Sequence, residues 1–386
     1  MTNKPQFVGE RVRLDELLLD TFSGEWGTEE GESLTPVLRT SNFNEDGSLD
    51  YSTPAMRCIP ERKVAKKRMV RGDIILEKSG GTPKRPVGIM AFCDSDELAL
   101  CSNFNQVLRF DEDRILPRFA FHQLRWLKDR NAFDRFTRKT TGLQNLQMKK
   151  LIELKLHVPQ IEAQTMIADT LDKIVDSQRN LQREIIDLDS LVKSRFVEMF
   201  GDPVLNPKGW STQNLKALGG LKNGVNFKSV DNGFEIKCLG VGDFKDRYAI
   251  KDMSLISDVS LNGEPNANQL LQDGDVVFVR SNGNKALVGR CLIIFPGEEE
   301  VTFSGFCIRF RNASKNLELD YLLNCLKTDS MRKAMTGRGA NIQNLSQSLL
   351  SKLKIPLPPL ELQQEFADFA SQVDKSRFAH LDNVLA

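Results

Sequence analysis

The chain has few of the side chains from which metal, redox and hydrolytic sites are usually built. Three histidines and seven cysteines occur in 386 residues, and no two cysteines have the two-residue spacing of a zinc ribbon or redox dithiol. The cysteines are expected to be small buried hydrophobes in a reducing compartment. No arrangement of serine, cysteine and histidine suggests a nucleophilic triad. These residues are Cys58, Cys93, Cys101, Cys238, Cys291, Cys307, Cys325, His122, His157 and His380.

Long apolar runs and nucleotide motifs are missing as well. No apolar run approaches the ~20 residues of a membrane helix, so we expect a cytoplasmic protein. A glycine-rich phosphate loop is absent, so nucleotide hydrolysis is not supported. A DNA amino-methyltransferase would need an Asn/Asp-Pro-Pro-aromatic loop, and the nearest strings, Asp202–Val204 and Asn206–Lys208, do not fit.

A strong charge imbalance is also absent. The 53 Lys and Arg residues nearly balance the 52 Asp and Glu residues, which leaves a formal net charge of +1. Without a global basic field, any nucleic-acid binding must come from local patches. The length and the hydrophobic content of 40% are typical of a soluble protein with two cores of ordinary size.

What the chain does contain is a long internal repeat. Residues 140–146 and 158–164 match residues 339–345 and 357–363. Four matched pairs are each separated by 199 residues: Gln144 and Gln343, Asn145 and Asn344, Pro159 and Pro358, and Glu162 and Glu361. We expect this strongest match to be a shared hinge where each domain joins a helix, rather than a DNA-reading segment.

The repeat extends through most of the chain. Residues 37–43 resemble 238–244 at an offset of 201, and residues 72–80 resemble 274–282 at an offset of 202. A drift of a few residues is expected if insertions lie in loops, and the period is far too long for a solenoid. The chain is therefore predicted to contain a domain duplication.

Each repeat is predicted to be a mixed α+β domain with a β centre. Gly-Asp turns precede short β-branched runs, and Gly, Ser and Asn clusters follow them. Val87–Ala91 and Val288–Phe295 are predicted as further strands. Segments 115–130 and 317–335 are predicted as helices because Leu, Phe and Trp recur at helical spacing.

A long amphipathic helix is predicted after Pro159, ending at Gly201-Asp202-Pro203. Its apolar positions alternate in steps of four and three, which is a heptad seam. At 1.5 Å per residue, ~40 residues give a rod of roughly 60 Å. The seam residues are Ile167, Leu171, Ile174, Gln178, Leu181, Ile185, Leu188, Val192, Arg195 and Met199.

The tail of the chain repeats this helix more weakly from Phe366. Its seam must be covered, and the economical partner is the long central helix, packed antiparallel. Packing of the tail helix on its own domain is the alternative. Since Glu361–Ala386 offers only 26 residues, the tail cannot cover the whole central seam.

Basic clusters and polar loops occur in both copies. Lys and Arg neutralise phosphates, and Arg, Asn and Gln recognise base edges in the groove, although a charge run can also be a solvated surface. Two loops that follow strands, Lys78–Arg85 and Arg280–Lys285, are suited to reading DNA. The candidate DNA-binding residues are Lys63, Lys66, Lys67, Lys78, Ser79, Lys84, Arg85, Arg138, Lys139, Arg280, Ser281, Asn282, Lys285 and Arg338.

Two other function classes remain open. A metal-dependent nuclease would use Asp134, Glu153 and Lys155, although the second copy has Lys352-Leu353-Lys354 at the place of the Glu-x-Lys string. A coiled-coil assembly protein without a DNA role would bind no duplex at any salt concentration.

Taken together, the chain resembles the specificity subunit of type I restriction-modification enzymes over essentially its whole length. The strings that carry the resemblance are Gln343–Leu345, Lys354–Gln364, the helix ending Arg195–Pro203 and the Gly-Asp strand entries. The resemblance implies two target-recognition domains, residues 1–158 and 202–358, separated by long antiparallel coiled-coil helices, residues 159–201 and 359–386. Each domain would read one half of a split double-stranded DNA target.

The resemblance also implies partners. Methyltransferase (modification) subunits would dock on the helices, at Ile167, Leu171, Ile174, Leu181, Ile185, Leu188 and Val192, and restriction (motor-nuclease) subunits would join the complex. The chain itself would be a non-catalytic subunit without a metal site, because S-adenosylmethionine, ATP and Mg would be bound by those partners. A methylation-only system without the restriction subunit is a further alternative. The short tail puts in doubt whether both docking surfaces are complete.

Overall fold

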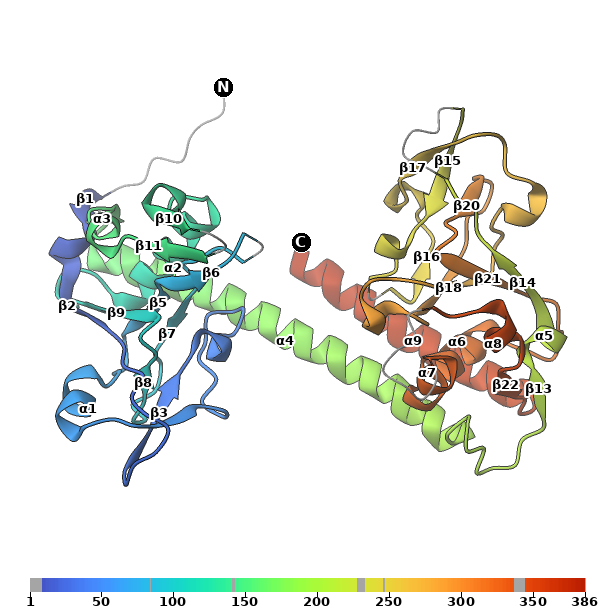
Figure 1. Ribbon diagram of the computed structural model, residues 1–386, viewed down its shortest axis with the longest axis horizontal. Coiled ribbons are helices and arrows are strands. Elements are labelled where there is room, and N and C mark those ends of the chain that lie inside the picture. The colour runs from blue at the N-terminus through green and yellow to red at the C-terminus, as the bar shows by residue number, and fades with distance from the viewer. Residues whose placement is uncertain are drawn as a thin grey trace. The chain divides into compact units, whose positions relative to one another are not determined.

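The computed structural model describes residues 9–83, 85–140, 143–227, 233–245, 247–336 and 344–385. The chain divides into two compact units, Met1–Asn180 and Leu181–Ala386. Each unit mixes helices with small sheets (Figure 1), as the sequence predicts.

The first unit is built around a four-stranded antiparallel sheet of order β2-β9-β5-β7. Three smaller sheets have the orders β4-β3-β8, β10-β11-β6 and β1-β12. The strands are β1 (Glu10–Arg13), β2 (Leu18–Ser23), β3 (Leu34–Leu38), β4 (Ala55–Cys58), β5 (Ile74–Glu77), β6 (Ser79–Gly81), β7 (Met90–Phe92), β8 (Leu100–Cys101), β9 (Asn105–Phe110), β10 (Thr137–Thr140), β11 (Leu143–Leu146) and β12 (Lys155–Val158).

The second unit repeats this plan. Its central sheet has the order β14-β21-β18-β19-β16, and the smaller sheets are β17-β15-β20 and β13-β22. The strands are β13 (Thr212–Asn214), β14 (Gly219–Asn223), β15 (Phe234–Leu239), β16 (Ala249–Ile250), β17 (Asp258–Leu261), β18 (Asp275–Val279), β19 (Cys291–Ile294), β20 (Val301–Phe303), β21 (Cys307–Asn312) and β22 (Lys354–Pro356).

The helices complete both units. The first unit contains α1 (Glu61–Lys67), α2 (Pro117–Asp129), α3 (Met148–Leu151), η1 (Leu14–Leu17), η2 (Thr40–Asn42) and η3 (Asp134–Phe136). The second contains α5 (Leu215–Leu218), α6 (Leu319–Lys327), α7 (Asp329–Thr336), α8 (Gln347–Ser351), α9 (Leu360–Leu385), η4 (Val241–Asp243), η5 (Met253–Leu255), η6 (Ala267–Gln269) and η7 (Lys285–Leu287). Helix α4 (Ile161–Phe200) contributes its first half to the first unit and its second half to the second.

The two units share unusual pairings as well as strand order. In each, the middle strand of a small sheet pairs in parallel on one side and antiparallel on the other: β3 with β8 and β4, and β15 with β20 and β17. In each, the first strand pairs with the strand just before a long helix, β1 with β12 and β13 with β22. These shared pairings confirm that the sequence repeat is a repeat of the fold.

The Gly-Asp turns of the repeat place a buried ion pair at the start of a central strand. Asp73 receives Arg109 Nε and Nη2 at 2.8 Å each, and Asp275 receives Arg311 Nε at 2.8 Å and Nη2 at 2.7 Å. Both carboxylates are fully buried. Because a bidentate guanidinium satisfies a buried carboxylate, the Asp-Arg pair fixes this strand entry identically in both units.

The Glu-x-Gln part of the repeat anchors the start of each long helix. Gln164 Oε1 accepts the Leu116 backbone N–H at 2.8 Å, and Gln164 Nε2 donates to the carbonyls of Pro159 and Arg114. Gln363 makes the three equivalent bonds, to the N–H of Glu318 and the carbonyls of Pro358 and Asn316. Both amides are buried, so each helix starts from a hydrogen-bonded joint rather than a flexible linker.

Helix α4 ends where the sequence predicts, and the reasons are local. Gly201 has a φ of 77°, a conformation that favours glycine. Lys208 Nζ donates to the free carbonyls of Glu198 and Met199 at 2.6 and 2.9 Å, and Trp210 Nε1 donates to that of Phe200 at 3.0 Å. These donors satisfy carbonyls that a helix end leaves without partners.

Helix α9 packs antiparallel to the second half of α4 within the second unit (Figure 1). Phe366 of α9 lies 5.4 Å from Phe196 and 5.7 Å from Phe200, measured between ring centroids. Further along, Asp189 of α4 and Asp374 of α9 line one cleft. The contacts therefore move toward the start of α4 as they move toward the end of α9, which is the antiparallel arrangement. The rings of Phe196 and Phe200 also contact Tyr321 of α6. The tail helix therefore packs both on its own domain and against the central helix.

Three predicted elements have different bounds. The strand predicted over Val288–Phe295 is shorter and is found at Cys291–Ile294. The helix predicted over 317–335 is divided into α6 and α7, because Thr328 adopts an extended conformation and its hydroxyl accepts the Met331 N–H. The strand predicted over Val87–Ala91 begins at Met90, because Gly88 has a φ of 102° that is incompatible with a strand.

The cysteines are free, and all but the half-buried Cys58 are buried.

Candidate nucleic-acid interface

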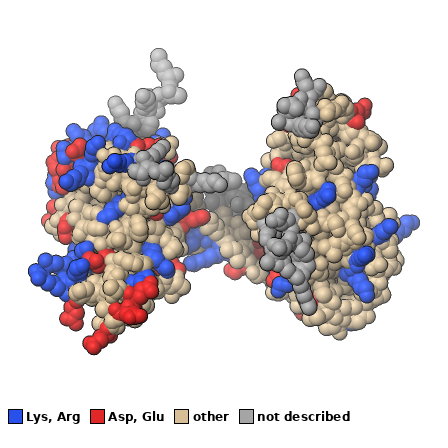
Figure 2. Space-filling view, in the orientation of Figure 1, with Lys and Arg blue, Asp and Glu red and all other residues tan. Residues whose placement is uncertain are grey.

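Lysine and arginine side chains gather over α1 (Figure 2). Lys66 is exposed, whereas Lys63 and Lys67 contact Glu25 Oε2 at 3.3 and 3.0 Å. The hydrogen bond from Lys67 lowers the pKa of Glu25. Because Glu25 compensates part of this charge, Lys66 is the lysine of α1 best placed to meet a phosphate.

The loop at residues 78–85, which we call the first recognition loop, is fixed at its base. The backbone N–H groups of Lys78 and Ser79 both donate to the Phe104 carbonyl, at 2.9 and 3.2 Å. The Lys78 carbonyl accepts the Leu146 N–H at 2.7 Å. Lys78 Nζ donates to Ser23 Oγ at 2.5 Å and to Gln106 Oε1 at 3.2 Å, and burial lowers the pKa of the Lys78 ammonium group.

The loop at residues 280–285, the second recognition loop, has the same base. The N–H groups of Arg280 and Ser281 both donate to the Phe306 carbonyl, at 2.8 and 3.3 Å, and the Leu345 N–H donates to the Arg280 carbonyl at 2.7 Å. Ser281 pairs with Asn344 as Ser79 pairs with Asn145.

This geometry corrects one prediction from the repeat. The Gln-Asn-Leu segment was expected at the hinge with Glu-x-Gln, but Asn145-Leu146 of β11 lies beside β6 and braces the first recognition loop. The segment lies away from the hinge because its alternating side chains suit a β-strand. Pairing with β10 and β6 then provides hydrogen-bond partners for its backbone N–H and C=O groups. The repeated motif is thus divided between two places in the fold, the recognition loop and the start of the helix.

The two recognition loops differ beyond their bases. In the first, a turn is closed by hydrogen bonds between Thr82 and Arg85, and Arg85 Nη1 lies 3.3 Å from Glu77 Oε1. Glu77 is buried, and its burial raises the pKa of that carboxyl. The equivalent residue in the second unit is Val279, and there the turn is held by the Asn282 carboxamide, which accepts the Asn284 N–H.

Of the remaining predicted DNA-binding residues, only Arg138 has a side chain that the structure describes. Arg138 is exposed on β10. Lys139 lies in β10 and Lys285 in η7, but their side chains are outside the described part of the structure, as are the whole of Lys84 and Arg338.

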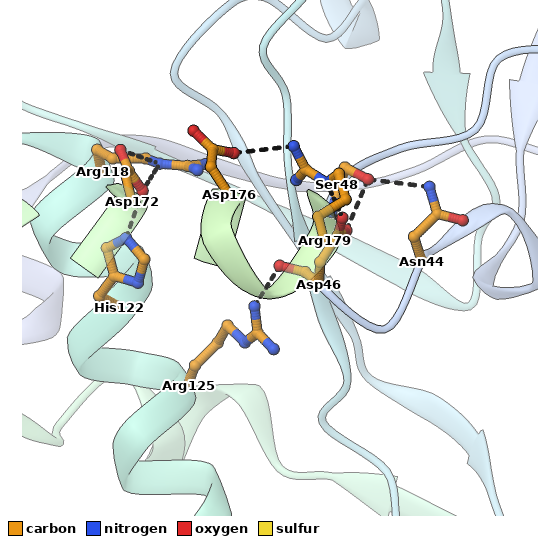
Figure 3. Close-up of polar contacts among 9 residues, drawn as sticks. All are labelled: Asn44, Asp46, Ser48, Arg118, His122, Arg125, Asp172, Asp176 and Arg179. Carbon is orange, nitrogen blue, oxygen red and sulfur yellow. Dashed lines mark hydrogen bonds and ion pairs between the residues drawn. The ribbon is translucent and has the colours of Figure 1, made fainter. Parts of the chain in front are cut away.

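A polar cluster holds the first half of α4 on the first unit (Figure 3). Asp172 accepts hydrogen bonds from Arg118 Nε at 2.7 and 2.9 Å, and its Oδ1 lies 2.7 Å from His122 Nε2. Arg179 Nε donates to Asp46 at 2.6 Å. Burial lowers the pKa of His122, although Asp172 opposes this. The cluster fixes the direction in which the helix leaves its domain.

The nuclease alternative has little geometric support. Asp134, Glu153 and Lys155 are all exposed, and Glu153 faces Arg13. Among the residues that the structure describes, no three His, Cys, Asp or Glu side chains are grouped as metal ligands.

Comparison with known proteins decides the class. The family model of the type I restriction modification DNA specificity domain matches residues 35–188 and 207–383. The chain belongs to this family. The two matched segments coincide with the two halves of the repeat, so each copy is a specificity domain. The family and the DNA-specificity function predicted from the sequence are thereby confirmed.

Two curated specificity subunits are similar along most of their length. The type I restriction enzyme StySPI specificity subunit of Salmonella potsdam is 24% identical over 368 residues, which cover 90% of this chain and 76% of the relative. The EcoKI specificity subunit of Escherichia coli K12 is 22% identical over 377 residues, with the same two coverages.

Solved structures share the fold of this specificity subunit. The crystal structure of the S subunit from M. genitalium has a TM-score of 0.58 at 16% identity and covers 100% of this chain and 94% of that one. A structure from work on assembly and conformational transition of the type I system has a TM-score of 0.54 at 18% identity and covers 99% and 95%. No described helix combines the length and the apolar character that crossing a membrane requires.

Proposed function

We propose that each unit of this specificity subunit recognises one half of a split DNA target, with residues 1–158 and 202–358 as the reading domains. The observation that carries the proposal is the pair of recognition loops. Their bases are held by the same hydrogen bonds, while their tips carry different chemistry, Thr82 and Arg85 in one and Asn282 and Asn284 in the other. A common base presents a loop identically, and different tips select different bases.

The long helices set the distance between the half-sites and receive the partners. Two weak readers on one rigid element gain effective concentration, and a rigid spacer selects one separation. The seam of α4 supports docking of methyltransferase subunits, because Ile167 is 37% and Ile174 is 49% exposed. The rest of the proposed docking seam, Leu171, Leu181, Ile185, Leu188 and Val192, is half-buried.

Methylation and cleavage are assigned to the partner subunits, together with binding of S-adenosylmethionine, ATP and Mg, and the complex is expected in the cytoplasm. The family membership supports this assignment, since a specificity subunit supplies recognition to a larger restriction-modification complex. The chain then contributes binding energy and geometry, and it directs the modification and restriction subunits to the target.

Methylome sequencing of the host tests the proposal. A split adenine-modified motif should be present in the wild type and vanish when the gene is deleted. Exchange of residues 1–158 with the corresponding domain of another specificity subunit should change one half of the motif and leave the other half and the spacer unchanged. The proposal fails if deletion removes no split motif, or if the exchange alters both halves.

A further inference from the structure

One large apolar side chain is exposed at the same position of both units. Phe104 is 55% exposed and lies between β8 and β9, and Phe306 is 61% exposed and lies between β20 and β21. They are 202 residues apart, which is the local offset of the repeat. Exposure of a phenyl ring is unfavourable in water, so its presence in both copies requires a reason.

The turn that carries each ring is rigid. The turn is closed by the Asn105 N–H donating to the Ser102 carbonyl in the first unit, and by the Cys307 N–H donating to the Ser304 carbonyl in the second. A glycine lies directly against each turn. A Cβ on Gly24 would meet the Ser102 carbonyl oxygen at 2.3 Å, and one on Gly224 would meet that of Ser304 at 2.2 Å.

Each ring is tied to a recognition loop. The carbonyl of Phe104 accepts the N–H groups of Lys78 and Ser79, and the carbonyl of Phe306 accepts those of the equivalent residues in the second recognition loop. The backbone that carries each ring is therefore fixed to the base of a recognition loop in each unit. In the first unit the ring itself lies beside the loop, because a Cβ built on Gly80 would be 4.0 Å from Phe104 Cδ1.

We propose that Phe104 and Phe306 make equivalent apolar contacts with base edges in the two half-sites. The proposal rests on the proposed DNA-reading function and deepens it. A phenyl ring offers nothing to a phosphate, so on a DNA-facing surface it contacts bases, as apolar side chains do with thymine methyl groups or with a base step. Because the ring is shared and the loop tips are not, the rings anchor both domains and the tips discriminate.

The test uses the full-length chain with its methyltransferase partner and duplexes of the target found by methylome sequencing. 2-Aminopurine is placed in one half-site at a time. Phe104→Ala and Phe306→Ala should each weaken binding about ten-fold, and each should change the fluorescence response in only one half-site, a different one for each variant. Phe→Tyr at either position should retain most of the affinity.

Exposed leucines away from the loops provide matched controls. Leu19→Ala and Leu205→Ala should bind as tightly as the wild type, and thermal unfolding verifies that every variant is folded. Wild-type affinity of both alanine variants would overturn the inference while leaving the proposed function intact. Normal DNA binding with loss of the methyltransferase partner would overturn it in favour of a protein contact. If the wild type does not distinguish its target from a scrambled duplex, the proposed function itself fails.

Discussion

Truncation of Gln164 tests whether the joint between domain and helix is as stiff as its contacts indicate. The buried amide makes three hydrogen bonds, at 2.8, 2.9 and 3.4 Å, to groups on both sides of the joint. At a net value of about 1 kcal/mol per bond, Gln164→Ala should lower the free energy of unfolding of the first unit by about 3 kcal/mol. For a unit of this size the thermal midpoint should fall by roughly 6–12 °C.

The repeat supplies an internal replicate for this measurement. Gln363→Ala should cost about the same in the second unit, because its three bonds join the equivalent groups. Gln178→Ala, at an exposed position of α4, should leave the unfolding free energy unchanged within about 0.5 kcal/mol. Thermal and urea unfolding followed by circular dichroism would measure all three.

A loose joint should also be visible in DNA binding. Binding is compared between the native target and duplexes whose spacer is one base pair longer or shorter. The wild type should reject the altered spacers, whereas Gln164→Ala should bind the three duplexes more equally because the domain can reorient on its helix. A destabilisation below about 1 kcal/mol together with unchanged spacer selectivity would refute the reasoning.

Three further predictions concern charge. Lys66→Gln should weaken binding to all duplexes alike and lower the slope of log K against log salt by about 1, whereas Lys173→Gln should not, as a salt titration would show. Burial lowers the pKa of His122, so the contribution of His122 to stability is complete above about pH 6.5 and is lost as the pH falls below that value. His122→Asn introduces the residue that the second unit has at the equivalent position, Asn324. This variant should flatten the pH dependence of the unfolding free energy measured by urea titration. Asp275→Asn should cost about 3–5 kcal/mol in unfolding free energy, because it leaves a guanidinium without its carboxylate; a loss under about 1 kcal/mol would contradict this.

The long helices could be predicted from sequence because their signals are local. Pro159, the four-three spacing and Gly201 determine the bounds of α4 within a few residues, and the structure has it at Ile161–Phe200. The duplication could be predicted because residues that hold the fold, such as Gln164 and Gln363, repeat at a constant distance.

The charge environment could not be predicted in this way, because it depends on residues far apart in the chain. Glu25 lies 42 residues from Lys67, and it compensates part of a cluster that is mostly basic in sequence. Asp73 and Arg109 are separated by 36 residues, so their role as a buried pair emerges only when their strands meet. Phe104 gave no sequence signal, since a single phenylalanine is normally a core residue.

The pairing of β1 with β12, and of β13 with β22, brings the two ends of each domain together at the start of a helix. A domain with adjacent ends can be removed and replaced without a change of path elsewhere in the chain. Since Gln164 and Gln363 make the same joint, a domain suited to one position also suits the other. If each domain reads one half-site, as proposed, a set of domains that fit both positions would give as many targets as there are ordered pairs of domains. The stock of specificities grows with the square of the number of domains.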